Sequence, residues 1–274
     1  MGEDCVPGGK KMYKTIKLRS SLLICVGAIL VAGSLIGSLV MGPVAEPDPY
    51  PLLHVDGDAA FVPQSGKCAY LTFDDGPSVN TPVILDLLKE KGIQATFFVT
   101  DQDEEYFEPM LKRMAAEGHT IGLHSDSHSY SSIYQSADSF LQDMDTLNQK
   151  IIQCTGVHPE IYRFPGGSSN KALQGAMGEE IRQAMAQRGY VYYDWNCVSN
   201  DSLGQVLSPD VLYRNMLQSA KGKNPVFLLC HDFAACTTTP ASVEMIIDEL
   251  LSQGYTFYPL SRQVEPYQFV PLDQ

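Results

Sequence analysis

The sequence of 274 residues predicts an α/β fold, a distorted barrel of seven or eight β/α units preceded by one transmembrane helix. Two observations carry this prediction. Short apolar segments alternate strictly with helical segments between residues 67 and 261, a pattern typical of a parallel sheet with outer helices. An uncharged apolar run also lies near the N-terminus, and its length suits a bilayer.

Seven segments are predicted to be strands because they are short, apolar and rich in β-branched or aromatic residues. They lie at residues 68–75, 95–100, 120–125, 161–165, 190–196, 225–232 and 255–260. Because a complete barrel of this class has eight strands, we expect an incomplete or distorted one.

Six helices are predicted between these strands. Their expected bounds are Thr81–Lys91, Glu105–Glu117, Phe140–Cys154, Glu179–Arg188, Pro209–Ala220 and Ser242–Ser252. A glycine follows the end of most of them, which is a common helix stop. Ser208 and Pro209 form a typical helix start.

The charges are unevenly distributed along the chain. Of 19 basic and 32 acidic residues, five basic and two acidic ones precede residue 20, which leaves 14 basic and 30 acidic residues in the rest. An acidic domain repels nucleic acid, so we expect no nucleic-acid partner.

The seven cysteines show no zinc-finger spacing, and their odd number excludes complete intramolecular pairing. The sequence does not decide whether Cys230 and Cys236 form a disulfide bond.

The apolar run covers residues 21–41 and contains no charged side chain. The basic residues flank its N-terminal side, so the positive-inside rule predicts a cytoplasmic tail at 1–20 and a main domain outside the cell. A cleaved signal peptide is the alternative, but the run is long for one and no good cleavage site follows. Residues 42–66 hold five prolines and are predicted to be an extended linker to a catalytic domain at 67–261, with a C-terminal tail at 262–274.

Residues capable of catalysis or metal binding stand where the predicted strands end. They are Asp74, Asp75, His124, Arg163, Asp201 and His231. In a parallel β/α fold these strand ends open on one face, which is where active sites are built. We therefore expect these side chains to share one site.

The segment His124-Ser-Asp-Ser-His128 places two imidazoles at positions i and i+4, on one side of a helical turn. With Asp75 as an oxygen ligand they could bind one metal ion and leave coordination positions open for water and substrate. Asp74 beside them could act as a general base. Taken alone, each pattern also fits a surface histidine pair or a simple turn.

Two further segments could complete such a site. Arg163 could keep a neighbouring carboxylate ionised, and the glycines after it could present backbone N–H groups to an oxyanion. His231 could protonate a leaving amine if Asp201 or Asp194 holds its other ring nitrogen. A strand-to-loop turn and a structural histidine remain the alternatives.

Five motifs together resemble, in order, those of the polysaccharide deacetylases, carbohydrate esterase family four with the NodB homology domain. These motifs are TFDDGP, HSDSH, RFPGG, DWNCVSND and LLCHD, and the resemblance covers residues 67–261. It implies a distorted (β/α) barrel and a divalent metal, usually Zn²⁺, with Co²⁺, Ni²⁺ or Mn²⁺ as alternatives. Within this family, the sequence most resembles the membrane-anchored peptidoglycan N-acetylglucosamine deacetylases.

The resemblance also implies roles for individual residues. Asp74 matches the general base, His231 the general acid, Arg163 the partner of the base and Asp201 the partner of the acid. The metal ligands correspond to Asp75, His124 and His128, and the oxyanion donor to the backbone of Gly166.

Two positions depart from the family pattern. Gly166 stands where an aromatic residue is usual, and Ser202 stands where a tryptophan is usual. We expect Phe164 or Trp195 to supply part of the missing substrate-binding wall.

The resemblance implies hydrolysis of N-acetyl groups from an amino-sugar polymer, either peptidoglycan or a chitin-like chain, with release of acetate. The alternatives are an O-acetyl esterase acting on acetylated xylan and a catalytically silent wall-binding module. A zinc peptidase is disfavoured because the chain has no HExxH pattern. The expected partners are the polysaccharide and, through the N-terminal helix, the cell membrane, and no obligate protein partner is implied.

Overall fold

The computed structural model describes residues 47–272, and residues from Asp48 onward form one compact unit. Within this range no helix is both long and apolar enough to cross a bilayer. The predicted cytoplasmic tail, the predicted transmembrane helix and the start of the predicted linker lie outside the described residues.

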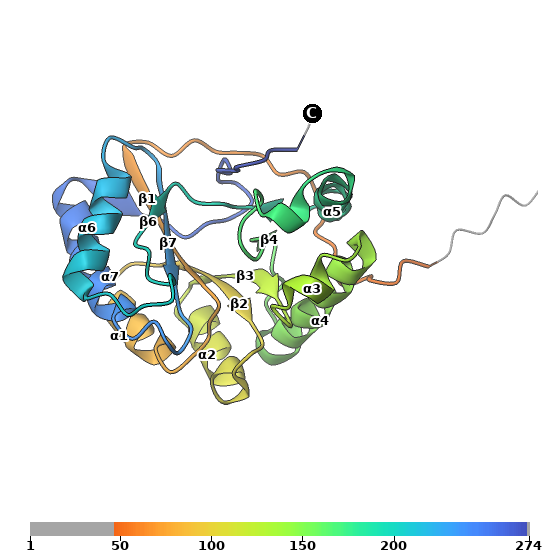
Figure 1. Ribbon diagram of the computed structural model, residues 1–274, viewed down its shortest axis with the longest axis horizontal. Helices are drawn as coiled ribbons and strands as arrows, with labels where there is room; N and C mark the ends of the chain where they lie inside the picture. The colour runs from red at the N-terminus through yellow and green to blue at the C-terminus, as the bar shows by residue number, and fades with distance from the viewer. Residues whose placement is uncertain (1–46, 273–274) are drawn as a thin grey trace, which may run out of the picture. The chain divides into compact units, whose positions relative to one another are not determined.

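One parallel sheet of eight strands forms the centre of this unit (Figure 1). The strand order is β5-β4-β3-β2-β1-β7-β6, and β8 pairs with β1 beside the start of that strand. The strands are β1 (Lys67–Asp74), β2 (Thr96–Thr100), β3 (Thr120–Ser125), β4 (Ile161–Tyr162), β5 (Val191–Tyr192), β6 (Cys197–Val198), β7 (Val226–His231) and β8 (Tyr255–Phe257).

The helices lie around the outside of the curled sheet (Figure 1). They are α1 (Thr81–Lys91), α2 (Glu104–Ala116), α3 (Tyr130–Ile133), α4 (Ala137–Thr155), η1 (Lys171–Leu173), α5 (Ala176–Gln187), α6 (Pro209–Ala220) and α7 (Thr239–Ser252). Six of these eight helices were predicted, and α4 begins three residues earlier than predicted because Ser136 caps it by accepting a hydrogen bond from the Ser139 amide.

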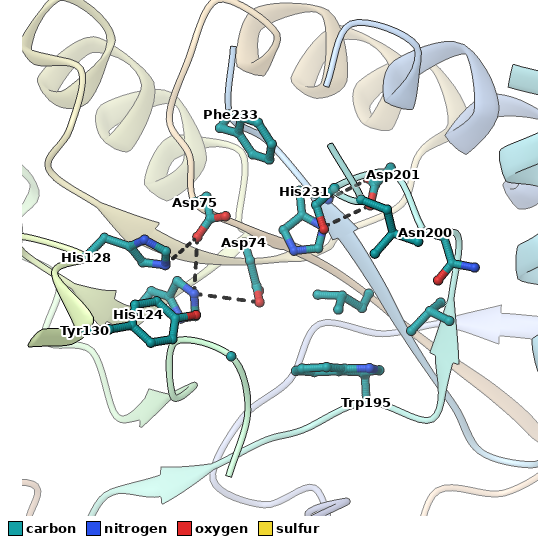
Figure 2. A pocket seen from close by; sticks show the side chains of 15 residues that line it. Asp74, Asp75, His124, His128, Tyr130, Trp195, Asn200, Asp201, His231 and Phe233 are labelled. Carbon is teal, nitrogen blue, oxygen red and sulfur yellow. Dashed lines mark hydrogen bonds and ion pairs between the residues drawn. The ribbon is translucent and has the colours of Figure 1, made fainter. Parts of the chain in front are cut away.

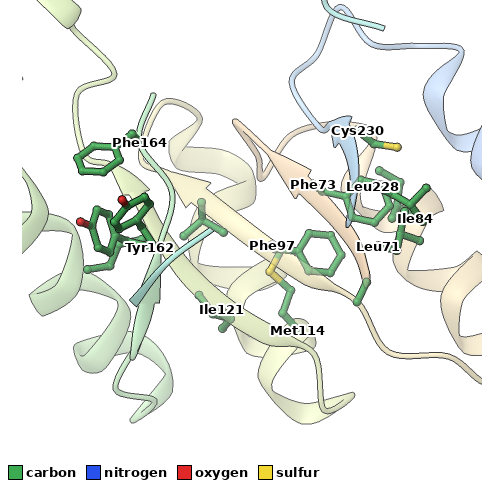
Figure 3. Close-up of a cluster of buried hydrophobic side chains, with 14 of the residues drawn as sticks. Leu71, Phe73, Ile84, Phe97, Met114, Ile121, Tyr162, Phe164, Leu228 and Cys230 are labelled. Carbon is green, nitrogen blue, oxygen red and sulfur yellow. The ribbon is translucent and has the colours of Figure 1, made fainter. Parts of the chain in front are cut away.

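The two faces of the sheet have different roles. Leu71 and Phe73 of β1 point outward, and Phe73 stacks on Phe97 at a ring-centroid distance of 5.0 Å in the main core beneath the helices (Figure 3). Because side chains alternate along a strand, Tyr70 and Asp74 point to the inner face. A smaller apolar cluster fills the inner face near the strand starts, and the polar residues lie near the strand ends.

Within the predicted strand at 190–196 only Val191–Tyr192 is a strand, and β6 begins just after it at the opposite edge of the sheet. The Tyr193 amide still bonds to the Tyr162 carbonyl beside β5, at 3.1 Å, whereas the Asn196 amide bonds to the Phe227 carbonyl of β7, also at 3.1 Å. Residues 193–196 therefore cross from one edge of the curled sheet to the other. The apolar run misled the prediction because Tyr193 and Asp194 are buried by this crossing rather than by strand pairing.

The predicted linker ends earlier than residue 66. Leu53 is fully buried in the main core, and the Arg188 guanidinium binds both Asp48 and the Leu53 carbonyl. Asp48–Val55 thus belongs to the compact unit, because its apolar side chains fill space beside α4 and α5. The five cysteines among the described residues are free, so no Cys230–Cys236 bond forms.

The predicted C-terminal tail also packs against the sheet. The Phe269 amide donates to the Asp194 carboxylate at 2.7 Å, and the Val270 amide donates to the Ser168 hydroxyl at 3.1 Å. These bonds tie the C-terminal segment to the loop that follows β4.

Replacing Leu53 by alanine should lower the free energy of unfolding by about 2–5 kcal/mol, because a fully buried leucine leaves a cavity. Leu52 is the matched control, since half of its side chain is exposed and its replacement by alanine should cost about 0.5 kcal/mol or less. Urea unfolding of both variants measures the difference. Equal effects would contradict the packing of this segment.

Candidate metal centre and active site

Most of the predicted site residues meet in one pocket at the carboxyl ends of the central strands, and Arg163 and Phe164 do not line it (Figure 2). Asp74 ends β1 and lies opposite His231 in the register of β1 with β7. The pocket has a volume of about 450 Å³, within the usual range for small-ligand sites. It is lined by Asp74, Asp75, His124, His128, Tyr130, Gly166, Trp195, Val198, Asn200, Asp201, Ser202, Leu203, Leu229, His231 and Phe233.

Asp75, His124 and His128 converge as predicted. Oδ1 of Asp75 lies 3.3 Å from Nε2 of His124 and 3.1 Å from Nε2 of His128. One ligand atom from each residue lies within 4.8 Å of the other two. Oδ1 is buried and has no well-formed hydrogen bond among the described residues. An unsatisfied oxygen facing two imidazole nitrogens is the donor set of a divalent metal site, and these three residues fit one.

The backbone turns sharply at Asp75 so that two consecutive carboxylates enter the same pocket. In a continuing strand Asp74 and Asp75 would point to opposite faces. Asp75 instead adopts a φ of 70°, which is uncommon for a residue other than glycine. The Thr100 amide and hydroxyl hold this turn by donating to the carbonyls of Gly76 and Asp75.

His124 and His128 are oriented by different neighbours. Nδ1 of His124 lies 2.8 Å from the Arg163 carbonyl, so Nε2 is the nitrogen left to face the metal site. The predicted helical turn between the two histidines is wrong: His124 lies on β3, and His128 lies in the loop after it with a φ of 49°. The histidines converge because this loop folds back.

Asp143 of α4 holds that loop in place. Its carboxylate accepts hydrogen bonds from the hydroxyls and amides of residues 125–127, including the Ser125 hydroxyl at 2.6 Å and the Ser127 amide at 3.0 Å. The Ser125 hydroxyl oxygen in turn accepts a bond from the His128 amide at 2.8 Å. Asp143 therefore positions His128 without lying in the pocket.

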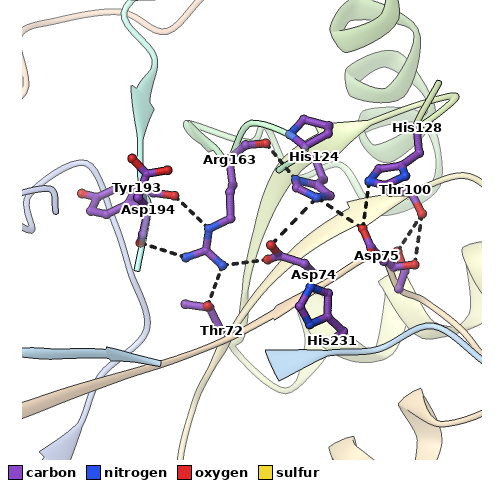
Figure 4. A network of polar contacts seen from close by, with 12 residues as sticks. Thr72, Asp74, Asp75, Thr100, His124, His128, Arg163, Tyr193, Asp194 and His231 are labelled. Carbon is purple, nitrogen blue, oxygen red and sulfur yellow. Dashed lines mark hydrogen bonds and ion pairs between the residues drawn. The ribbon is translucent and has the colours of Figure 1, made fainter. Parts of the chain in front are cut away.

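Arg163 and Asp74 form the buried ion pair of the site (Figure 4). Nη1 of Arg163 lies 2.7 Å from Oδ1 of Asp74 and also donates to the Thr72 hydroxyl. The remaining guanidinium nitrogens donate to the carbonyls of Tyr193 and Asp194. This arrangement leaves Oδ2 of Asp74 facing the metal centre, 3.9 Å from Nε2 of His124.

The metal-centre carboxylate is held in its charged form. Burial alone would raise the pKa of Asp75, but the two imidazoles outweigh that effect and hold the pKa well below its usual range. An ionised carboxylate beside two imidazoles suits a cation.

His231 and Asp201 form a second pair across the pocket from the metal centre (Figure 2). Nδ1 of His231 lies 2.9 Å from Oδ1 of Asp201, and Oδ2 accepts bonds from the His231 amide and the Thr239 hydroxyl. Burial alone would lower the pKa of His231, but the bond and charge of Asp201 outweigh it and raise that pKa. Asp194, the other predicted partner, instead binds Ser168.

Of the two residues predicted to line the substrate-binding wall, Trp195 lies in the pocket and Phe164 does not. Trp195 lines the pocket, and so does Gly166, whose amide donates to no other group among the described residues. The prediction for Phe164 is wrong, because its side chain is buried in the main core against Phe140 and Tyr192. Since Arg163 points to the inner face, the next residue points to the helices.

Sequence reasoning missed other pocket residues, including Tyr130, Asn200, Leu203 and Phe233. Tyr130 and Phe233 each lie two residues after a predicted site histidine. That closeness in sequence was the available signal, although it does not predict which way a loop side chain points.

Known proteins are similar to this chain in sequence and in fold. The family model for polysaccharide deacetylase matches residues 62–192. A peptidoglycan-N-acetylglucosamine deacetylase of Bacillus cereus is 31% identical over 195 residues, which cover 70% of this chain and 68% of the relative.

Two solved structures are similar as well. The catalytic domain of a peptidoglycan N-acetylglucosamine deacetylase from Eubacterium rectale is 34% identical with a TM-score of 0.69, covering 78% of this chain and 97% of that domain. The polysaccharide deacetylase Bc1974 from Bacillus cereus is 29% identical with a TM-score of 0.66, covering 74% and 97% of the two chains.

The fold and the site define an enzyme of the α/β class with a carboxylate, an imidazole and a metal-ligand triad at the strand ends. With the matches above, the chain belongs to the polysaccharide deacetylase family.

Replacing Asp143 by alanine should weaken metal binding about 10–100-fold, because the loop that carries His128 loses its anchor. Gln142, the exposed neighbour on α4, provides the control variant Gln142→Ala. Titration of the metal-free protein with Zn²⁺ measures the affinity. Unchanged affinity in Asp143→Ala would show that the loop holds its position without this carboxylate.

Proposed function

We propose that this chain is a metal-dependent hydrolase that removes N-acetyl groups from the amino sugars of peptidoglycan at the outer face of the cell membrane. One observation carries the proposal: the metal-ligand triad and the His231–Asp201 pair face each other across one pocket, with Asp74 between them (Figure 2). Amide hydrolysis needs a base, an acid and an electrophile at one carbonyl, and this pocket brings groups suited to each task together.

The proposed metal ion is Zn²⁺, held by Asp75, His124 and His128. When bound, it would polarise the acetyl carbonyl and make water more acidic. The choice of zinc rests on two imidazoles and one carboxylate, a common ligand set for catalytic zinc.

Asp74 is the proposed general base. Its Oδ1 is paired with Arg163, which leaves Oδ2 free on the side of the pocket where water would attack the carbonyl carbon. The Arg163 guanidinium fixes the direction of the carboxylate through this ion pair. Asp74 then accepts the proton of the attacking water.

His231 is the proposed general acid. Asp201 binds Nδ1, so Nε2 is the nitrogen that faces the pocket and donates a proton to the leaving amine. As the C–N bond breaks, acetate forms and the sugar keeps a free amino group. The unengaged amide of Gly166 faces the oxygen that becomes negative when water adds.

The substrate and the location rest on different support. Relatives with about one-third identity are named peptidoglycan N-acetylglucosamine deacetylases, and Trp195 gives the pocket an aromatic face for a sugar ring. The apolar run at 21–41, with basic residues before it, supports a single-pass anchor that keeps the domain outside the cell.

Asp74→Asn and His231→Ala should each reduce turnover by at least about 100-fold while the protein stays folded, because each removes a proton-transfer group. Acetate release from peptidoglycan, chitooligosaccharide and acetylxylan, with and without a chelator, measures the activity. We expect the N-acetylated substrates to react, the chelator to stop the reaction and added Zn²⁺ to restore it.

Asp86→Asn and His158→Ala are the matched controls, since both residues are exposed and lie outside the pocket. Near-normal rates in Asp74→Asn or His231→Ala would reject the assigned roles. Release from acetylxylan alone would favour the O-acetyl esterase, and release from no substrate would favour a silent binding module.

The alkaline limit of activity should depend on Asp201. His231 must be protonated to act as an acid, and its raised pKa keeps it protonated above its ordinary value of about 6.5. In Asp201→Asn the burial of His231 is opposed only by the smaller effects of the Asp74 and Asp75 charges, so its pKa should fall and activity should be lost at lower pH. Profiles of kcat against pH for both proteins test this, and superimposable alkaline limbs would contradict it.

A further inference from the structure

The space beside Gly166 is filled by Tyr130. A Cβ atom added to Gly166 would lie 2.9 Å from the Tyr130 hydroxyl oxygen and 3.2 Å from its ring. It would also lie 2.8 Å from the side-chain nitrogen Nδ2 of Asn170. The family usually has an aromatic residue at position 166, and here the aromatic ring of Tyr130, from a different segment, lies beside Gly166.

The hydroxyl of Tyr130 is available to a substrate. The side chain lines the pocket and is 42% exposed. Among the described residues its hydroxyl has no hydrogen-bond partner, whereas the hydroxyl of Tyr134, one turn later, donates to the Pro165 carbonyl at 2.8 Å. In Figure 2 the ring of Tyr130 lies beside His124 and His128, with its oxygen toward the interior of the pocket.

The position of Tyr130 is fixed by its surroundings. Its ring packs edge-on against His128 at 5.5 Å and against Tyr134 at 5.8 Å. Ile133 of α3 is buried in the main core. The hydrogen bond from the Tyr134 hydroxyl to the Pro165 carbonyl connects the end of α3 to the loop that carries Gly166. The Tyr130 hydroxyl and the Gly166 amide therefore border the same part of the pocket from two linked segments.

We propose that Tyr130 is a catalytic residue whose hydroxyl donates a hydrogen bond, together with the Gly166 amide, to the acetyl oxygen as that oxygen becomes negative. This inference rests on the proposed deacetylation. Water adds to the carbonyl carbon, a C–O bond forms and the carbonyl π electrons move to the oxygen. Tyr130 keeps its proton throughout; the proton of the attacking water goes to Asp74, and His231 supplies the one that the amine takes as the C–N bond breaks.

A donor aimed at the developing charge acts mainly in the transition state. Its loss should therefore lower kcat more than it raises KM. A simple aromatic wall would behave differently, because phenylalanine has the same ring and would preserve it.

The test compares Tyr130→Phe with wild-type protein on chitotetraose as the N-acetylated substrate. We expect kcat to fall roughly 10–100-fold at nearly unchanged KM, with zinc content unchanged. A phosphonamidate, whose tetrahedral phosphorus mimics the adduct, should lose affinity by the same factor. Tyr213→Phe is the matched control, since it removes a half-buried hydroxyl on α6 that lies 3.4 Å from Glu249 and outside the pocket.

Each other outcome overturns the inference. An unchanged kcat would show that Tyr130 only lines the pocket. A change confined to a higher KM would show that it contacts the substrate equally in the ground state and the transition state. A loss of zinc would show that the substitution acts by disturbing His128. An inactive wild-type protein would reject the proposed function and this inference with it. An active wild-type protein whose Tyr130→Phe variant has the same kcat would reject this inference alone.

Discussion

The buried ion pair between Arg163 and Asp74 is the interaction on which the site depends. The guanidinium is fully buried, lies 4.2 Å from the Phe98 ring centroid and uses its nitrogens to bind Asp74, Thr72 and two backbone carbonyls. Removing one partner of such a pair typically costs about 3–5 kcal/mol, because the other charge stays buried. The pair joins β1 to the chain after β4 and to residues 193–194, so the fold and the direction of the base are fixed together.

Much of the site could be predicted because a parallel sheet places its strand ends on one face. That rule predicts that Asp74, His124, Arg163 and His231 lie at the same face of the sheet. The ligand triad and the His231–Asp201 pair have the predicted partners. Sequence patterns of this kind succeed where the chemistry lies on regular strands, because alternation and register are then nearly determined.

The remaining features depend on loop paths and on packing between distant segments. Phe164 was misplaced because the inward position of Arg163 forces its neighbour outward, which the motif alone does not reveal. Tyr130 reaches the pocket only because the loop after β3 folds back onto Asp143. The buried position of Leu53 likewise depends on a partner far along the chain, Arg188, so a proline-rich composition indicated a free linker.

The pocket lining is acidic, with Asp74, Asp75 and Asp201 among its residues and no lysine or arginine. Such a site needs a cation to draw negative charge onto a substrate oxygen, so the central claim is that one metal ion lies between Asp75, His124 and His128. The most direct test is a crystal structure of the zinc-loaded protein with anomalous data collected at the zinc edge. The account predicts a single strong peak within bonding distance of all three side chains. A peak elsewhere, or a His128 turned away from it, would contradict the account.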